Sequence, residues 1–200
     1  GKPITAIDQI YEGFTYVIGS PIVGGLLLLS ILPFLFGLTI NTLLPAFSTD
    51  VLHGGPDDLG LLMTGMGAGA IIGSLVLAKM GNVRHKGYWL IGTSAFWGLL
   101  VSTFALSTSA MMATVVIACI GFISAVNMSM NRSIVQLQVE QQMRGRIMSI
   151  DMMSHGLMPL GVLPIGYIAE MVSIQAALVT SGVILCASTL LLGWLMPAVR

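Results

Sequence analysis

Residues 22–46 read IVGGLLLLSILPFLFGLTINTLLPA, an apolar stretch without a charged side chain. An α-helix needs about 20 predominantly apolar residues to cross a hydrocarbon core about 30 Å thick. The stretch therefore predicts a membrane-spanning helix. Five further stretches meet the same criterion, with charged or turn-forming residues between them: 59–79, 88–107, 110–134, 147–169 and 174–196. The sequence thus predicts an all-α integral membrane protein whose residues 21–200 form a bundle of six transmembrane helices.

The composition supports this fold class. The chain has 200 residues, of which 56% are hydrophobic and 8% are charged. A soluble domain carries about 25% charged residues, so this chain has too few to cover a water-facing surface. Its two cysteines, Cys119 and Cys186, lie in apolar runs and have no partner at metal-ligand spacing. We therefore expect no metal site, no cofactor and no enzymatic activity, because no span carries a nucleophile set or a cluster of metal ligands.

The basic residues predict how the helices are oriented. Lys and Arg are enriched in cytoplasmic loops, and six crossings place all of them on one side of the membrane. They are Lys2, Lys79, Arg84, Lys86, Arg132, Arg144, Arg146 and Arg200. The opposite side carries the acidic residues Asp50, Asp57, Asp58 and Glu170. We therefore predict a multi-pass protein of the cell membrane (inner or plasma membrane) with both ends of the chain in the cytoplasm.

Residues 1–20 differ from the spans. Ile4, Ile7, Tyr11 and Phe14 recur at intervals of three or four, with polar residues between them. This spacing predicts an amphipathic cytoplasmic helix that lies along the membrane surface or against the bundle.

The second span carries a glycine-rich segment, Gly65-Met66-Gly67-Ala68-Gly69-Ala70. A dinucleotide-binding loop would need a preceding strand and an acidic residue about 20 positions later, and neither is present. Gly65, Gly69 and Gly73 instead recur every four residues, which predicts a smooth helix face for close packing.

Two polar sets lie within the spans. Asp151 and His155 are four apart and share one face of the fifth span. They form either a proton-responsive pair or an interfacial pair that orients the helix end, and the shallow depth of Asp151, about 6 Å from the start of the span, favours the second. The other set comprises Asn41, Ser124, Asn127 and Asn131. Buried amides need hydrogen-bond partners, so these residues either line a substrate cavity or hold helices together.

The segment 144–170 is the most specific. It begins with Arg144-Gly145-Arg146 and continues with Gly156-x-x-Pro159-Leu160-Gly161 and Gly166-x-x-Ala169. Glycine and proline at this density predict a helix that bends and packs closely, with Gly156, Pro159 and Gly161 in that role. With these motifs, the sequence resembles the major facilitator superfamily, in the branch of enterobactin and macrolide exporters.

The resemblance implies one six-span half of a twelve-span carrier, with residues 1–20 as the linker and the N-terminal half apparently absent. It implies alternating access, export of small hydrophobic or amphipathic molecules with proton antiport as one means of coupling, and a substrate cavity beside the amide residues. It also suggests a gating role for the basic residues Arg84, Lys86, Arg144 and Arg146, although charge-directed topology explains them equally well.

The expected partners are the lipid bilayer, the missing half of the carrier and a small-molecule substrate, without nucleic acid. On its own, the chain is expected not to transport. The alternative is a non-transporting membrane scaffold or permease-like subunit.

Overall fold

The computed structural model describes residues 15–80 and 86–196, except for the side chains of Met80, Lys86, Ser154 and His155. The regular structure in this part is helical, and six helical segments are long and apolar enough to cross a membrane. The predicted six-helix membrane fold is confirmed. Residues 15–19 are helical, whereas most of the predicted amphipathic helix over 1–20 lies outside the described residues.

Two of the six spans are interrupted. The first consists of α2 (Pro21–Leu32), the π-helical turn η1 (Pro33–Gly37), α3 (Thr39–Ala46) and a second π-helical turn η2 (Phe47–Val51). The fifth consists of α7 (Arg144–Ser154), the 3-10 turn η3 (His155–Leu157) and α8 (Met158–Met171). The other four are continuous: α4 (Pro56–Met80), α5 (Lys86–Ala105), α6 (Ala110–Gln138) and α9 (Ile174–Leu195).

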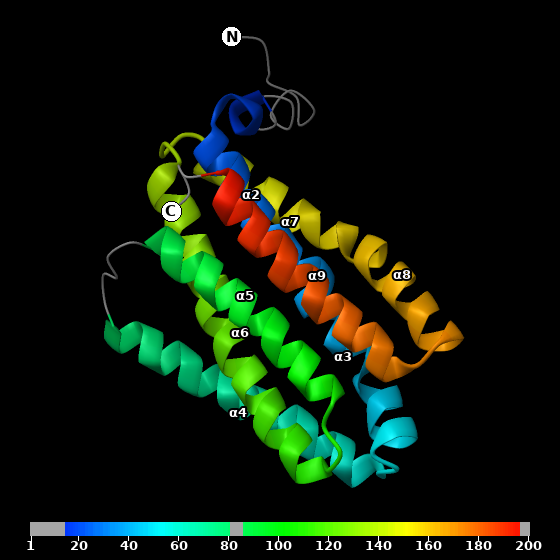
Figure 1. The fold of residues 1–200 in the computed structure, drawn as a ribbon. Coiled ribbons are helices and arrows are strands. Elements are labelled where there is room, and N and C mark those ends of the chain that lie inside the picture. The colour runs from blue at the N-terminus through cyan, green and yellow to red at the C-terminus, as the bar shows by residue number, and fades with distance from the viewer. Residues whose placement is uncertain (1–14, 81–85, 197–200) are drawn as a thin grey trace.

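The helices are arranged in two layers (Figure 1). In this view α5 and α9 lie side by side in front, and α4 and α8 lie at opposite edges. α6 packs against both α4 and α5, while η1 contacts α5, α8 and α9. The described chain begins and ends at the same end of the bundle, as an even number of crossings requires.

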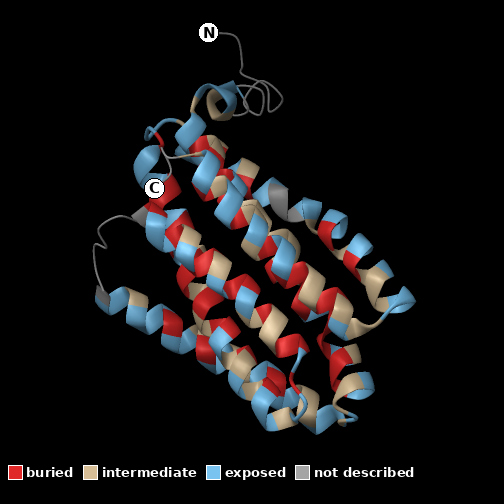
Figure 2. Cartoon of the chain, viewed as in Figure 1, coloured by how far each residue is buried: buried red, intermediate tan, exposed pale blue. Residues whose placement is uncertain are grey.

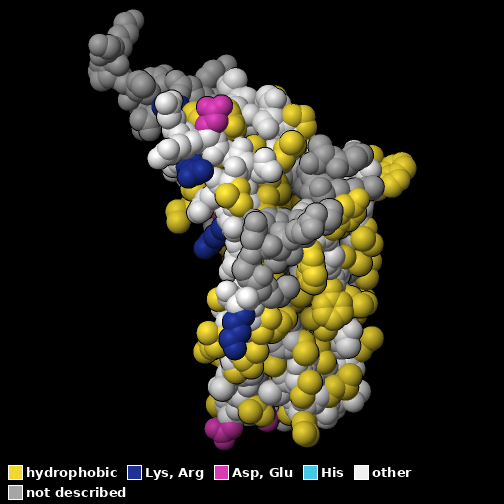
Figure 3. Space-filling view, turned by 90° about the vertical axis from the view of Figure 1, so that its left-hand side faces the viewer, with side chains coloured by type: hydrophobic (Ala, Val, Ile, Leu, Met, Phe, Trp, Pro, Cys, Tyr) yellow, Lys and Arg dark blue, Asp and Glu magenta, His cyan; other side chains and the backbone are white. Residues whose placement is uncertain are grey.

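Apolar side chains on the inner helix faces form the core (Figure 2). One cluster includes Trp97, Phe47 and Phe104, and the ring centroids of the two phenylalanines are 4.5 Å apart. A second cluster lies nearer the chain ends and includes Val23 and Ile147. The outer surface is also largely apolar, as the face seen in Figure 3 shows, which is expected of a protein whose solvent is lipid.

Candidate functional site

Two asparagines of α6 connect this helix to its neighbours. Asn127 is 1% exposed. Its Nδ2 lies within hydrogen-bond distance of three acceptors on α5: Thr93 Oγ1 at 2.8 Å, Ser94 Oγ at 2.7 Å and the Leu90 carbonyl at 3.2 Å. Asn131 is 3% exposed, and its Nδ2 donates to the Leu26 carbonyl of α2 at 3.1 Å. An unpaired buried amide costs about 1–3 kcal/mol, so these bonds stabilise α6 against α5 and α2.

Asp151 belongs to α7, and its side chain contacts α2. The residue is 4% exposed, and the Ser30 hydroxyl donates to its Oδ1 at 2.7 Å. The sequence places Asp151 near the membrane interface, whereas the structure buries its side chain, because α2 crosses directly beside it. The predicted pairing of Asp151 with His155 involves a side chain outside the described ones.

Asp151 and both asparagines face a narrow polar space between α2, α6 and α7. Its volume of about 10 Å³ is close to what one water molecule needs. The lining residues are Ser30, Pro33, Phe34, Asn127, Met128, Asn131, Arg132 and Asp151. The structure thus brings three of the predicted polar residues together and adds Ser30 and Arg132, which the sequence analysis did not assign to the site.

The π-helical turn η1 forms one side of this region. Its backbone accepts hydrogen bonds from side chains: Ser181 of α9 donates to the Phe36 carbonyl at 2.6 Å, and Thr39 donates to the Leu35 carbonyl at 2.7 Å. A Cβ added at Gly161 of α8 would overlap the Leu35 carbonyl. The first, fifth and sixth spans therefore meet closely at η1. The motif that contains Gly161 predicts close packing of the fifth span but does not identify its partner.

The glycine face of α4 lies against α6. A Cβ at Gly69 would overlap the Ala118 carbonyl, and one at Gly73 would lie 2.5 Å from the Phe122 carbonyl oxygen. The Cβ at Gly65 would be 3.0 Å from a methyl group of Thr114. These contacts allow the two backbones to approach closely, as the four-residue spacing predicts.

α6 contributes a matching glycine that the sequence analysis missed. A Cβ at Gly121 would overlap the Met66 carbonyl of α4, so the close approach is reciprocal. Gly98 and Gly182 do the same between α5 and α9, since a Cβ at Gly98 would lie 2.5 Å from the Gly182 carbonyl oxygen. Neither glycine has another glycine four residues away in its own helix, so the four-residue pattern of α4 is missing and only the partner helix reveals the close approach.

Comparison with known proteins identifies the family of this chain. The model of the family described as transmembrane secretion effector matches residues 4–198, nearly the whole chain. The chain belongs to this family of the major facilitator superfamily. Membership confirms the resemblance deduced from the segment 144–170.

Among curated proteins, this family member is similar to the enterobactin exporter EntS. It is 28% identical to the protein of Escherichia coli O1:K1 / APEC over 141 residues, which cover 70% of this chain and 33% of the exporter. It is 27% identical to that of Shigella boydii serotype 18, with the same coverage. The chain thus spans about a third of the length of the curated relatives it matches. No solved structure matches it.

The remaining predicted residues of this family member lie apart from the polar space. Asn41 is exposed on α3. Ser124 is buried but donates within its own helix, to the Gly121 carbonyl at 2.9 Å. Gly156 lies in the turn η3, where a Cβ would meet nothing within 4 Å, so it makes no packing contact of the predicted kind. Pro159 lies in the first turn of α8, where proline is well tolerated.

The basic residues gather toward the end of the bundle where the described chain begins and ends. Arg144 is exposed, and its Nε donates to the Val139 carbonyl at 3.3 Å. Arg146 is half-buried and contacts the Met143 sulfur at 3.5 Å. Arg84 and the side chain of Lys86 lie outside the described part. Within the described residues, no group of three or more His, Cys, Asp or Glu side chains could hold a metal ion.

Proposed function

We propose that this chain is a six-span bundle of a carrier that exports small molecules and that it works together with a second six-span bundle. The observation that carries the proposal is the family match over residues 4–198. Relatives named as exporters, of which this chain spans about a third, support it. In such carriers two bundles surround a central site and rock against each other to give alternating access.

Differences in burial among the six spans indicate which two of them would contact the second bundle. Only 17% of the most apolar window of α4 and 12% of that of the α7–α8 span are buried, against 39–44% in the other four spans. These two poorly buried spans lie at opposite edges of the bundle (Figure 1). A second bundle in contact with both edges would enclose the surface between them, on the side away from α5 and α9.

The distribution of charge supports an orientation with both chain ends in the cytoplasm. Lys79 lies in the last turn of α4, and Arg144 begins α7, so each is separated from the described chain ends by an even number of crossings. Asp57 and Asp58 lie in the first turn of α4, at the other end. Cytoplasmic enrichment of basic residues gives this orientation in a cell membrane.

We further propose that Asp151 takes up and releases the proton that couples to export. Ionisable side chains buried in membrane spans are costly and commonly serve proton or substrate pathways. Asp151 meets this description, and its bond to Ser30 joins the fifth span to the first. Protonation would weaken this bond between the spans, while exposed Arg132 of α6 lines the same space and supplies the nearby positive charge.

The test is efflux from cells that produce the intact carrier with its second bundle. We expect these cells to accumulate less enterobactin, or less of an amphipathic dye such as ethidium, than cells without the carrier. The chain produced alone should not lower accumulation. Unchanged accumulation of a panel of such hydrophobic and amphipathic compounds by the intact carrier would refute the export proposal.

Proton coupling is tested separately in inverted vesicles. Asp151→Asn should abolish the dependence of uptake on the proton gradient, measured with and without an uncoupler. The matched control is Asp50→Asn, because Asp50 is exposed and accepts a bond from Thr49 at the opposite end of the bundle. If Asp151→Asn retains the full dependence, export stands and this coupling role is wrong.

A further inference from the structure

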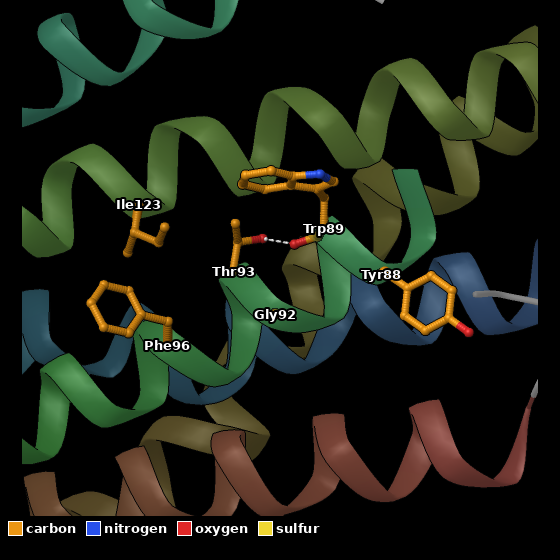
Figure 4. Close-up of a pocket in the computed structure, with 6 residues that line it drawn as sticks. All are labelled: Tyr88, Trp89, Gly92, Thr93, Phe96 and Ile123. Carbon is orange, nitrogen blue, oxygen red and sulfur yellow. Dashed lines mark hydrogen bonds between the residues drawn. The ribbon is translucent and has the colours of Figure 1, made fainter. Parts of the chain in front are cut away.

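A pocket of about 360 Å³ opens on the exposed face of α5, outside the polar site (Figure 4). Tyr88 and Trp89 lie toward one end, and Phe96 and Ile123 toward the other, with Gly92 and Thr93 between them. Ile123 belongs to α6, so the pocket lies where the two helices diverge. Its volume falls within the range of about 300–1,000 Å³ that small-molecule sites occupy.

The pocket faces the hydrocarbon of the bilayer. Three large exposed residues of α5 recur at helical spacing and are apolar: Trp89 is 49% exposed, Phe96 49% and Leu99 56%. α9, which packs beside α5, presents Leu190 and other apolar side chains on its outer face in the same way. The proposed second bundle lies on the side away from α5 and α9, so this apolar surface of α5 is left to the lipid.

Measured along the axis of α5, the pocket extends from the membrane interface across about one leaflet. α5 begins at Lys86, and at about 1.5 Å per residue Phe96 lies about 15 Å farther along the axis. This distance is half of a hydrocarbon core about 30 Å thick. Tyr88 and Trp89 lie in the first turn, at the level where tyrosine and tryptophan are enriched at membrane interfaces.

The polar group at the floor of the pocket, the Thr93 hydroxyl, already has hydrogen-bond partners within the protein. The Thr93 hydroxyl is 2.8 Å from the Trp89 carbonyl, to which it donates, and it accepts from Asn127. A ligand therefore gains little from hydrogen bonding at the floor and is held by dispersion contacts with the surrounding side chains. An aliphatic chain suits such a site better than a polar molecule does.

We propose that the pocket binds one acyl chain of a phospholipid from the leaflet on the side where α5 begins. A bilayer fills hollows on the surface of a protein with its own chains. The indole ring of Trp89 and the phenyl ring of Phe96, at the two ends of this pocket, would hold a chain longer than an open helix face does. The bound chain would also lie against Thr93, one hydrogen bond away from Asn127 and the polar space.

Gly92 offers a way to close the site without disturbing the fold. A Cβ at Gly92 would meet nothing within 4 Å, although the residue lines the pocket. A leucine at this position would extend into the pocket and occupy the place of the chain. Gly166 of α8 also has open space around a Cβ but does not line the pocket, so Gly166→Leu is the matched control.

The experiment is photo-labelling of the intact protein in nanodiscs of phosphatidylethanolamine and phosphatidylglycerol that contain a phospholipid with a diazirine in its acyl chain. Adducts are mapped by mass spectrometry. We expect labelling of Phe96 and Ile123 to exceed that of Leu190 and Trp194 on the outer face of α9 several-fold. Gly92→Leu should reduce labelling in the pocket several-fold, whereas Gly166→Leu should leave it unchanged.

Phe96→Ala provides a second variant that does not depend on filling the pocket. It widens one end, and labelling of Ile123 should persist or increase. Equal labelling of the pocket and of α9 would overturn the proposal, as would full labelling in Gly92→Leu protein whose helical content is unchanged. Absence of adducts in the pocket would also overturn it, because it would mean that another protein segment covers the site.

Discussion

The close packing of α4 against α6 can be tested by adding a methyl group where the two helices cross. In Gly69→Ala, the added Cβ would overlap the backbone carbonyl of Ala118. The size of such an overlap can be judged at Gly73, one turn further along α4. A Cβ there would lie 2.5 Å from the Phe122 carbonyl oxygen, about 0.9 Å closer than the 3.4 Å at which ordinary contact begins. The overlap at Gly69 is larger, and a backbone carbonyl cannot rotate away. The helices must therefore separate by about 1 Å or more.

A gap of 0.5–1 Å forfeits about a quarter to a half of each dispersion contact that it opens. Overpacking of this kind typically costs about 1–3 kcal/mol, and we expect Gly69→Ala to lie near the upper end of that range. The assay is reversible denaturation of the intact protein in mixed micelles, with the free energy of unfolding obtained from circular dichroism. Gly121→Ala should cost a similar amount, because its Cβ would overlap the Met66 carbonyl at the same crossing.

The matched control lies two residues away. A Cβ at the exposed Gly67 would meet nothing within 4 Å, so Gly67→Ala should leave the free energy of unfolding unchanged or raise it by up to about 1 kcal/mol, because alanine favours the helix more than glycine does. Because Gly69 and Gly121 belong to one crossing, the double alanine variant should cost less than the sum of the single variants. Equal stability of the Gly69→Ala and Gly67→Ala proteins would refute the close contact between α4 and α6.

Three further substitutions test individual hydrogen bonds. Asn127→Leu removes the bonds from α6 to α5 and should lower the free energy of unfolding by about 1–3 kcal/mol in the same denaturation assay; an unchanged value would contradict the connecting role. Ser181→Ala leaves the Phe36 carbonyl without its side-chain donor and should cost about 0.5–1.5 kcal/mol, with faster hydrogen exchange in η1 as a local measure. Ser109→Ala removes the N-cap of α6, whose hydroxyl accepts from the Met112 amide, and should cost about 1 kcal/mol and speed exchange of that amide.

The sequence predicts the spans well because lipid imposes a simple requirement. Apolar length alone indicates where a helix can cross, and the predicted span 88–107 differs from the observed Gly87–Ala105 by one and two residues. The first span shows the limit of this argument. It was predicted to end at residue 46 but continues to Val51 through a π-helical turn, because hydropathy marks where apolar residues end and not where the backbone stops being helical.

The candidate site was predicted in part. Asn127 and Asn131 were expected either to line a cavity or to hold helices together. In the structure both donate hydrogen bonds to neighbouring helices and face a space about the size of one water molecule, while their part in a substrate cavity stays a prediction. Sequence could not decide, because an amide needs a partner in both cases. Burial of Asp151 was missed for a related reason: depth along the membrane normal does not reveal that Ser30 of another span lies beside the carboxylate.

Two serines of α9 show why the rest lay beyond sequence reasoning. Ser188 donates to the Ile184 carbonyl four residues earlier in its own helix, as serines in membrane helices commonly do. Ser181, seven residues before it, donates instead to the Phe36 carbonyl of the first span. Nothing in the residue type or the flanking apolar sequence separates the two. The difference arises in η1, where the π-helical turn presents backbone carbonyls that side chains of neighbouring helices satisfy. Pro33 and Gly37 bound this turn and were visible in the sequence, yet they only show that the helix can deviate there. Trp97 of the third span and Leu185 of the sixth pack against Gly37 at this turn, and this packing exists only after three distant spans have come together.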